Sequence, residues 1–270
     1  MNEQRVYEDL LKDIMYNISI KNNKKTEILI KKLVEEYEVE NIEDLHIQNI
    51  FKHAVTNGNS KAIRIALSYN LNPNNTSTEY SHGSPLFFAL HRNSLKMAKL
   101  LILNGAKVNI SEKNSNTPLS LLLTSDYNHN HLLWKQILTM MLKRGADVNM
   151  VEPKNGLTPI LRAVEKCRHI TKNDYDFIKL INVVDKLIYL NEKYDVHINI
   201  HKKGKDGRDI KTIFEGVLNS KSDRNVVFHG YFNKLSEKIR EFLVSIEKKE
   251  INNHLKTGLP KKESGVKNRI

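Results

Sequence analysis

The sequence predicts an all-α solenoid of stacked helix–turn–helix units with projecting hairpin loops. The stretch LLILNGAKVNISEKNSNTPLSLLL at 100–123 returns about forty residues later as MLKRGADVNMVEPKNGLTPILRAV at 141–164, and such a period is typical of stacked repeats. Apolar residues recur three and four positions apart within each unit, which is the pattern of an amphipathic helix. Ser or Thr followed by Pro opens three units and Gly closes two, and these residues start and end helices.

The first segment, residues 1–45, is predicted to be a helical N-terminal cap. Apolar residues spaced by four from Val6 to Ile18 predict a helix over about 4–20. A polar break follows, and we expect Thr26 to cap a second helix that runs to Tyr37. A terminal unit must expose one face to water, so the acidity of this segment fits a cap.

Residues 46–218 are predicted to form an array of about four to five units. The first unit indicates two short helices separated by a turn at Asn57-Gly58. The next three units open at Ser84-Pro85, Thr117-Pro118 and Thr158-Pro159. These openings lie 33 and then 41 residues apart, and we expect insertions near 124–134 and 166–177. A weaker copy begins at Asp206.

The C-terminal segments are predicted to differ from the array. Apolar residues spaced from Phe232 to Ile246 predict a capping helix over 219–247. Residues 248–270 are charged and contain Gly258 and Pro260, so they are predicted to be a basic disordered tail.

The phrases GAKVN…NTPL and GADVN…NGLTPI, at the 33-residue spacing, resemble ankyrin repeats. The resemblance is closest over 84–164, less close over 47–83 and 156–217, and slight elsewhere. It implies antiparallel helix pairs stacked side by side, projecting loops, a protein-binding role and no catalysis. The family usually has His after Thr-Pro-Leu, where this chain has Phe87, Ser120 and Leu161. We expect apolar packing to replace that His.

The resemblance also implies which side chains face a partner. Hairpin tips and the exposed positions of the first helix in each pair line one concave surface. The tip positions include Tyr80, Lys113, Glu152, Lys154, Lys202 and Lys203, and the helix positions include Phe88, His91, Arg92, Arg162, Glu165 and Lys166. Aromatic and Arg side chains carry most of the binding energy at interfaces, so the first candidates are Tyr80, Phe88, Arg92 and Arg162. For Phe88 the alternative is ordinary packing between units, and for the tip charges it is plain solvation.

The net charge of +12 leaves a second function open. Residues 1–50 carry a net charge of −4 and residues 248–270 a net charge of +5. The basic loop 202–211 and the tail could bind nucleic acid or an anionic membrane electrostatically. Single-stranded nucleic acid also needs aromatic platforms, which this loop lacks.

Three patterns that could carry chemistry have simpler interpretations. His129-Asn130-His131 lies in an inserted loop without the flanking Cys pair of a metal site. Cys167 and His169 are two residues apart, which puts them on different faces of a helix. Gly204-Lys205 lacks the upstream Gly and the Ser or Thr of a phosphate-binding loop. We therefore expect no enzyme, no cofactor, no metal site and no small-molecule substrate.

The inserted loop near 124–134 is a second candidate contact region. Long loops inside compact arrays are often functional. The alternative is that Leu132, Leu133 and Trp134 begin the next helix and are buried there.

The composition limits the cellular compartments in which the chain is expected to work. A hydrophobic fraction of 40% supports a real core. The lone Cys167 excludes a disulfide scaffold and is compatible with a reducing compartment. No membrane-spanning run and no secretory signal peptide are evident. We expect a monomeric, cytoplasmic chain with a protein partner, similar to proteins that host-associated bacteria and large DNA viruses direct at host proteins, delivered without a cleavable signal peptide. A role in positioning another domain of the same chain is the third alternative.

Overall fold

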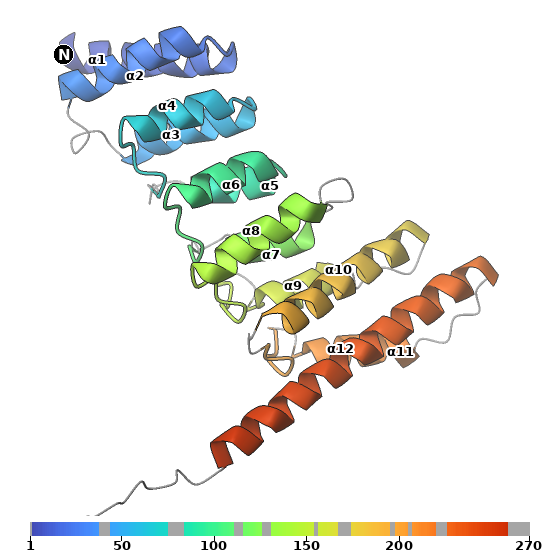
Figure 1. Ribbon diagram of the computed structural model, residues 1–270. Coiled ribbons are helices and arrows are strands. Elements are labelled where there is room, and N and C mark those ends of the chain that lie inside the picture. The colour runs from blue at the N-terminus through green and yellow to red at the C-terminus, as the bar shows by residue number, and fades with distance from the viewer. Residues whose placement is uncertain are drawn as a thin grey trace, which may run out of the picture.

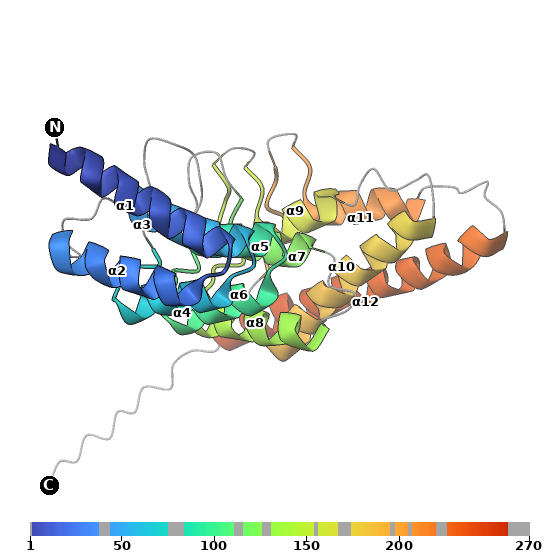
Figure 2. The same cartoon turned by 90° about the horizontal axis from the view of Figure 1, so that it is seen from above.

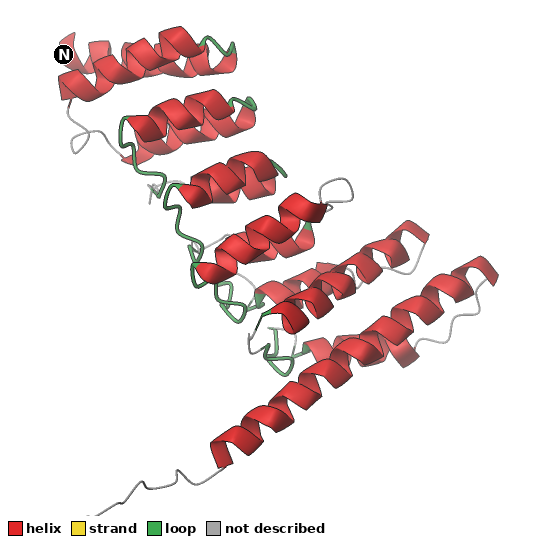
Figure 3. Cartoon of the chain, viewed as in Figure 1, coloured by secondary structure: helices red, strands yellow, loops and turns green. Residues whose placement is uncertain are grey.

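The computed structural model describes residues 2–37, 44–74, 84–110, 116–125, 131–153, 156–166, 174–194, 198–204, 207–219 and 226–258. Within these ranges the chain forms twelve helices and no strand. Figure 3 shows the helices joined by loops and turns. The structure confirms the predicted all-α solenoid.

The helices form six successive pairs that descend like a staircase from the N-terminus (Figure 1). Within each pair the two helices follow one another in the chain and pack together. The pairs are α1 (Asn2–Ser19) with α2 (Asn23–Tyr37), α3 (Asp44–Thr56) with α4 (Ser60–Ser68), α5 (Pro85–His91) with α6 (Leu95–Leu103), α7 (Pro118–Thr124) with α8 (His131–Lys143), α9 (Pro159–Lys166) with α10 (Asp174–Lys193), and α11 (Ile210–Asn219) with α12 (Val226–Gly258).

The pairs stack so that the first helices form one layer and the second helices form another (Figure 2). The first helices contact one another in order from α1 to α11. The second helices do so from α2 to α8, and α12 packs along α10. The described parts of the loops between pairs rise on the side of the first helices (Figure 2). The first helices and these loops therefore share one face of the molecule.

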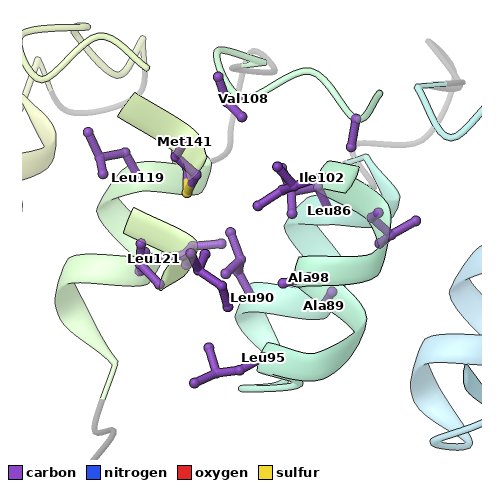
Figure 4. Packing of buried hydrophobic residues seen from close by; sticks show 14 of the residues in the cluster. Leu86, Ala89, Leu90, Leu95, Ala98, Ile102, Val108, Leu119, Leu121 and Met141 are labelled. Atoms are coloured by element: carbon purple, nitrogen blue, oxygen red, sulfur yellow. The ribbon is translucent and has the colours of Figure 1, made fainter. Parts of the chain in front are cut away.

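The core runs through the stack, between the helix pairs. Figure 4 shows Leu90 of α5 directed toward Leu121 of α7, with Ile102 of α6 in the same cluster. Burying a Leu or Ile side chain contributes about 1.5–3 kcal/mol to folding. Because each apolar face is covered by the neighbouring pair, the stability of every pair depends on the pairs beside it.

Short polar residues begin the helices as predicted. The Ser84, Thr117 and Thr158 hydroxyls each accept a hydrogen bond from the backbone N–H three residues on, at 3.2, 3.1 and 3.2 Å. Each bond satisfies a backbone donor that the first turn of a helix leaves without a partner.

The predicted cap at Thr26 is wrong. The α2 helix begins at Asn23, and the Asn22 side chain accepts from the Lys25 backbone N–H at 3.3 Å. Thr26 is buried and its hydroxyl donates back to the Asn22 carbonyl oxygen at 2.9 Å. An Asn one turn earlier was as good a cap by type, so composition alone did not distinguish the two.

Two glycines allow the sharp turns that end α6 and α8. Gly105 has φ of +89° and Gly145 has φ of +77°. A residue with a Cβ is strained in this left-handed conformation, and Gly is not. The predicted closures at these glycines are confirmed.

An Asn side chain joins each loop to the next one along the stack. Asn109 follows α6, and its Nδ2 donates to the Gly145 carbonyl oxygen at 2.6 Å. Its Oδ1 accepts from the Asp147 backbone N–H at 2.9 Å. One amide group thus satisfies a backbone acceptor and a backbone donor of the next unit.

The same connection recurs at the equivalent Asn of other units, and we call the set the asparagine ladder. Asn74 donates to the Gly105 carbonyl oxygen at 3.0 Å and accepts from the Lys107 N–H at 2.6 Å. Asn149 accepts from the Asn199 N–H at 3.1 Å. The ladder explains why the repeated phrase ends in Asn each time.

The C-terminal end departs from the predicted boundaries. The α11 and α12 helices form a sixth pair, in which Phe214 packs edge to face against Phe242 with ring centroids 6.0 Å apart. The α12 helix continues to Gly258, so residues 248–258 are helical where the sequence predicts the start of the tail. Lys249 explains part of this extension, since its Nζ donates to the carbonyl oxygens of Asn191 and Tyr194 at the end of α10.

We predict that Asn109→Ala lowers the free energy of unfolding by about 1–2 kcal/mol, because two backbone groups lose their partner. Urea unfolding followed by circular dichroism measures the change. Asn252→Ala, on an exposed position of α12, is the matched control and should change the free energy by less than about 0.5 kcal/mol. Equal losses in the two variants would contradict a role of the ladder in stability.

Candidate binding face

The structure places some of the predicted contact residues and not others. Tyr80, Lys113 and Lys154 lie outside the described residues, and the side chain of Lys166 is not described. Lys202 and Lys203 are exposed on the loop before α11. Of the remaining candidates, Phe88, His91 and Arg162 lie on the first helices, and Arg92 follows the last residue of α5.

Phe88 belongs both to the packing and to the surface. It is half-buried and packs against the core, as the alternative interpretation required. The Lys52 Nζ atom of α3 lies 5.3 Å from the centre of its ring, which is within the range of a cation–π contact. The Phe87 ring meets it edge to face at 5.9 Å, and His91 stacks on Phe87 at 5.7 Å.

Arg162 is held by a buried carboxylate. Its Nη1 lies 3.3 Å from Oε2 of Glu152, and the two side chains are 31% and 0% exposed. The other carboxylate oxygen of Glu152 accepts from the Ser120 hydroxyl at 2.6 Å and from the Thr117 backbone N–H at 3.3 Å. The predicted position of Glu152 at a hairpin tip is therefore wrong, because the side chain points into the stack.

This network also corrects the expected replacement of the family's His. At Ser120 a charged hydrogen-bond network joins neighbouring units, so the expectation of apolar packing is wrong there. At Leu161, which is buried, apolar packing is confirmed. Phe87 is half-buried and stacks on His91.

The C-terminal basic loop is partly neutralised by the chain itself. Arg208 pairs with Glu165 of α9 at 3.3 Å. Burial alone would raise the pKa of Asp209, but hydrogen bonds from Thr212 and the positive charges of His201 and Lys203 outweigh burial and lower it. Arg208 and Lys203 of this loop therefore already lie near carboxylates of the same chain.

The first turn of α8, which follows the inserted loop of the fourth pair, contains a buried Trp. Trp134 is fully buried, and its Nε1 donates to the Leu122 carbonyl oxygen at 3.0 Å, which confirms burial over contact for this residue. Leu132 is exposed, so the expectation that it is buried at the start of this helix is wrong. Lys186 of α10 donates to the Ser125 carbonyl oxygen at 2.8 Å, which satisfies an acceptor just beyond the end of α7.

Most residues of the three chemical patterns singled out in the sequence lie outside the part of the chain that the structure describes. Cys167, His169, His129, Asn130 and Lys205 lie outside the described residues. Across the part of the chain that the structure describes, no three His, Cys, Asp or Glu side chains come together in a way that could hold a metal ion.

Taken together, the stacked helix pairs, the capped first helices and the loops joined through Asn define a helical repeat protein. A family model described as "Ankyrin repeats (3 copies)" matches residues 14–114. Over these residues the chain is similar to the ankyrin-repeat family. The match begins inside α1, so it covers part of the segment that the sequence predicts to be an N-terminal cap.

One relative is the ankyrin repeat protein FPV230 of Fowlpox virus (strain NVSL). It is 34% identical over 71 residues, which are 26% of this chain and 34% of the relative. The chain therefore matches about a third of the length of that relative. Among the described residues no helix has both the length and the apolar character needed to cross a membrane.

We predict that Arg162→Ala lowers the free energy of unfolding by about 2 kcal/mol or more, because it leaves a buried carboxylate without its cation. Arg92→Ala is the control. Arg92 is exposed and forms no ion pair with another described residue, so the change should stay within about 0.5 kcal/mol.

A second substitution tests whether the lost ion pair causes the loss of stability in Arg162→Ala. Glu152→Gln should recover part of the stability lost in Arg162→Ala, because it removes the uncompensated charge. Chemical unfolding of the single and double variants measures this coupling. A double variant less stable than Arg162→Ala alone would contradict the ion-pair explanation.

We also predict that acid destabilises the fold through His53. Burial, and then the positive charge of Lys52, lower the pKa of His53 below its ordinary value. The unfolded chain then binds a proton at higher pH than the folded chain, so stability falls as the pH drops below about 6.5. Urea unfolding at about pH 7.5 and about pH 5 should show a smaller loss in His53→Gln than in the natural chain. Identical losses would contradict the assignment.

Proposed function

We propose that the chain is a non-enzymatic module that binds a partner protein through its concave face. Ankyrin repeats are in general protein–protein interaction modules. In this proposal the concave face consists of the exposed positions of the first helices together with the loops that rise beside them.

The proposal rests on a difference between the buried and the exposed positions of the first helices. Counted from the capping residues Ser84, Thr117 and Thr158, the positions two, five and six residues on are buried and apolar in α5, α7 and α9. These positions hold Leu86, Ala89 and Leu90, then Leu119, Leu122 and Leu123, then Ile160, Ala163 and Val164. The positions seven and eight residues on are not buried and differ from unit to unit, with His91 and Arg92 at the end of α5 and Thr124 and Ser125 at the end of α7. A constant inner pattern with a variable outer one suits a scaffold whose exposed side chains choose a partner.

The relative from a poxvirus supports a setting in which the partner is a host protein. In this proposal the chain works in the host cytoplasm as an effector or host-range factor and reaches it without a cleavable signal peptide. Its binding unit is a monomer.

We predict that the immobilised chain retains a dominant protein from a nuclease-treated eukaryotic lysate, identified by mass spectrometry. The variant His91→Ala/Arg92→Ala should lose it, because both side chains are exposed on the proposed face. Lys96→Ala/Lys143→Ala, on the outer helices, is the matched control and should retain it.

The same experiment tests the electrostatic alternative. Lys202→Ala/Lys203→Ala removes two exposed charges from the loop before α11. Retention of nucleic acid alone, or of proteins that only this variant loses, would show that the basic loop and not the concave face is the binding site. Phosphate-dominated binding would also fall steeply with salt concentration.

A further inference from the structure

The N-terminal half of the concave face is basic and aromatic. Its side chains are Lys52 of α3 and Phe88, His91 and Arg92 at α5, and we call this set the N-terminal basic face. Residues 46–56, which make up α3 beyond its first two residues, and residues 84–94 and 116–125, which span α5, α7 and their caps, contain no Asp or Glu, whereas α3 begins with Asp44. In the described part of the chain Lys52, His91 and Arg92 form no ion pair. The carboxylate that reaches α7 from outside is Glu152, which is buried and paired with Arg162.

The C-terminal half of the same surface is different, because three of its cations are already paired. Arg162 faces Glu152 and Arg208 faces Glu165, both at 3.3 Å. Lys211 lies 3.5 Å from Glu247. A negatively charged partner would have to displace these internal contacts, whereas among the described residues no carboxylate pairs with Lys52 or Arg92.

We infer that the N-terminal basic face binds an acidic segment of a partner protein. Carboxylates of that segment pair with Lys52 and Arg92, and an apolar side chain of the segment packs on the exposed part of Phe88. Complementary charge of this kind mainly sets the choice of partner and the rate of association, while a buried apolar anchor supplies affinity. The inference rests on the proposed function, since it describes the partner of the same concave face.

Two observations favour a protein segment over nucleic acid. Single-stranded nucleic acid needs aromatic rings with open faces for base stacking. Here the Phe88 ring faces Lys52 and the Phe87 ring faces His91. The charges also come from successive helices, whose axes lie about 8–10 Å apart in packed pairs, so they are more widely spaced than a cluster that grips adjacent phosphates.

The test is a selection of random peptides of about 12 residues displayed on phage, with the full chain as bait. Enriched peptides should carry several Asp or Glu residues and at least one apolar residue. Each enriched peptide is then synthesised with its Gln and Asn counterpart, and affinity is measured by fluorescence anisotropy. The uncharged counterpart should bind about tenfold more weakly or worse.

Substitutions in the chain test where the acidic peptides bind. Lys52→Gln/Arg92→Gln should weaken the acidic peptides about tenfold, and Phe88→Leu should weaken them while keeping an apolar side chain in the stack. Lys96→Gln/Lys143→Gln removes the same charge from the outer helices and should change affinity by less than about twofold. Circular dichroism of each variant checks that the array is folded.

Several outcomes overturn the inference. Enriched peptides without acidic bias that still lose affinity with His91→Ala/Arg92→Ala leave the proposed function standing and refute the acidic partner. Acidic peptides weakened equally by the face and the outer-helix variants refute the location. Peptides insensitive to every concave-face variant refute both proposals. Tighter binding of a single-stranded DNA oligomer at this face than of any peptide would assign it to nucleic acid.

Discussion

The contact between neighbouring helix pairs is the interaction on which the rest of the structure depends. One pair has two short helices with apolar residues on several sides, and it cannot enclose them alone. Leu90 of α5 and Leu121 of α7 become buried only because they belong to adjacent pairs. Stability is therefore close to a sum of nearest-neighbour terms. This leaves the surface away from the contacts free to take on a function.

The junction between the fourth and fifth pairs shows how a contact can restrict that freedom. Glu152 is fully buried there, and a buried carboxylate is tolerated only with hydrogen bonds and a cation. Ser120 and Thr117 supply the bonds and Arg162 supplies the charge. Arg162 stands at a position suited to binding a partner, yet its guanidinium is engaged in holding two units together.

Local rules predicted much of the fold, because they act within one turn of chain. Capping by Ser84, closure at Gly105 and burial of Leu86 follow from residue type and spacing alone. The contacts of Glu152 and Asn109 did not follow, since their partners lie 32 to 38 residues away and are brought close only by the stacking. For the site, the sequence indicated the exposed positions at α5. It could not distinguish Arg92, which forms no ion pair with another described residue, from Arg162, which pairs with Glu152. The helical extent of α12 depended likewise on Lys249 meeting α10.

The asparagine ladder has a consequence for how such a chain can change over generations. Asn74 and Asn109 take their partners from the backbone of the next loop, never from its side chains. Any unit with the same turn can accept the bonds, whatever its other residues are. A duplicated or deleted unit therefore meets a compatible junction at once, and its exposed residues can diverge afterwards without loosening the joint. The array behaves as a set of interchangeable modules whose number is easier to alter than their shape.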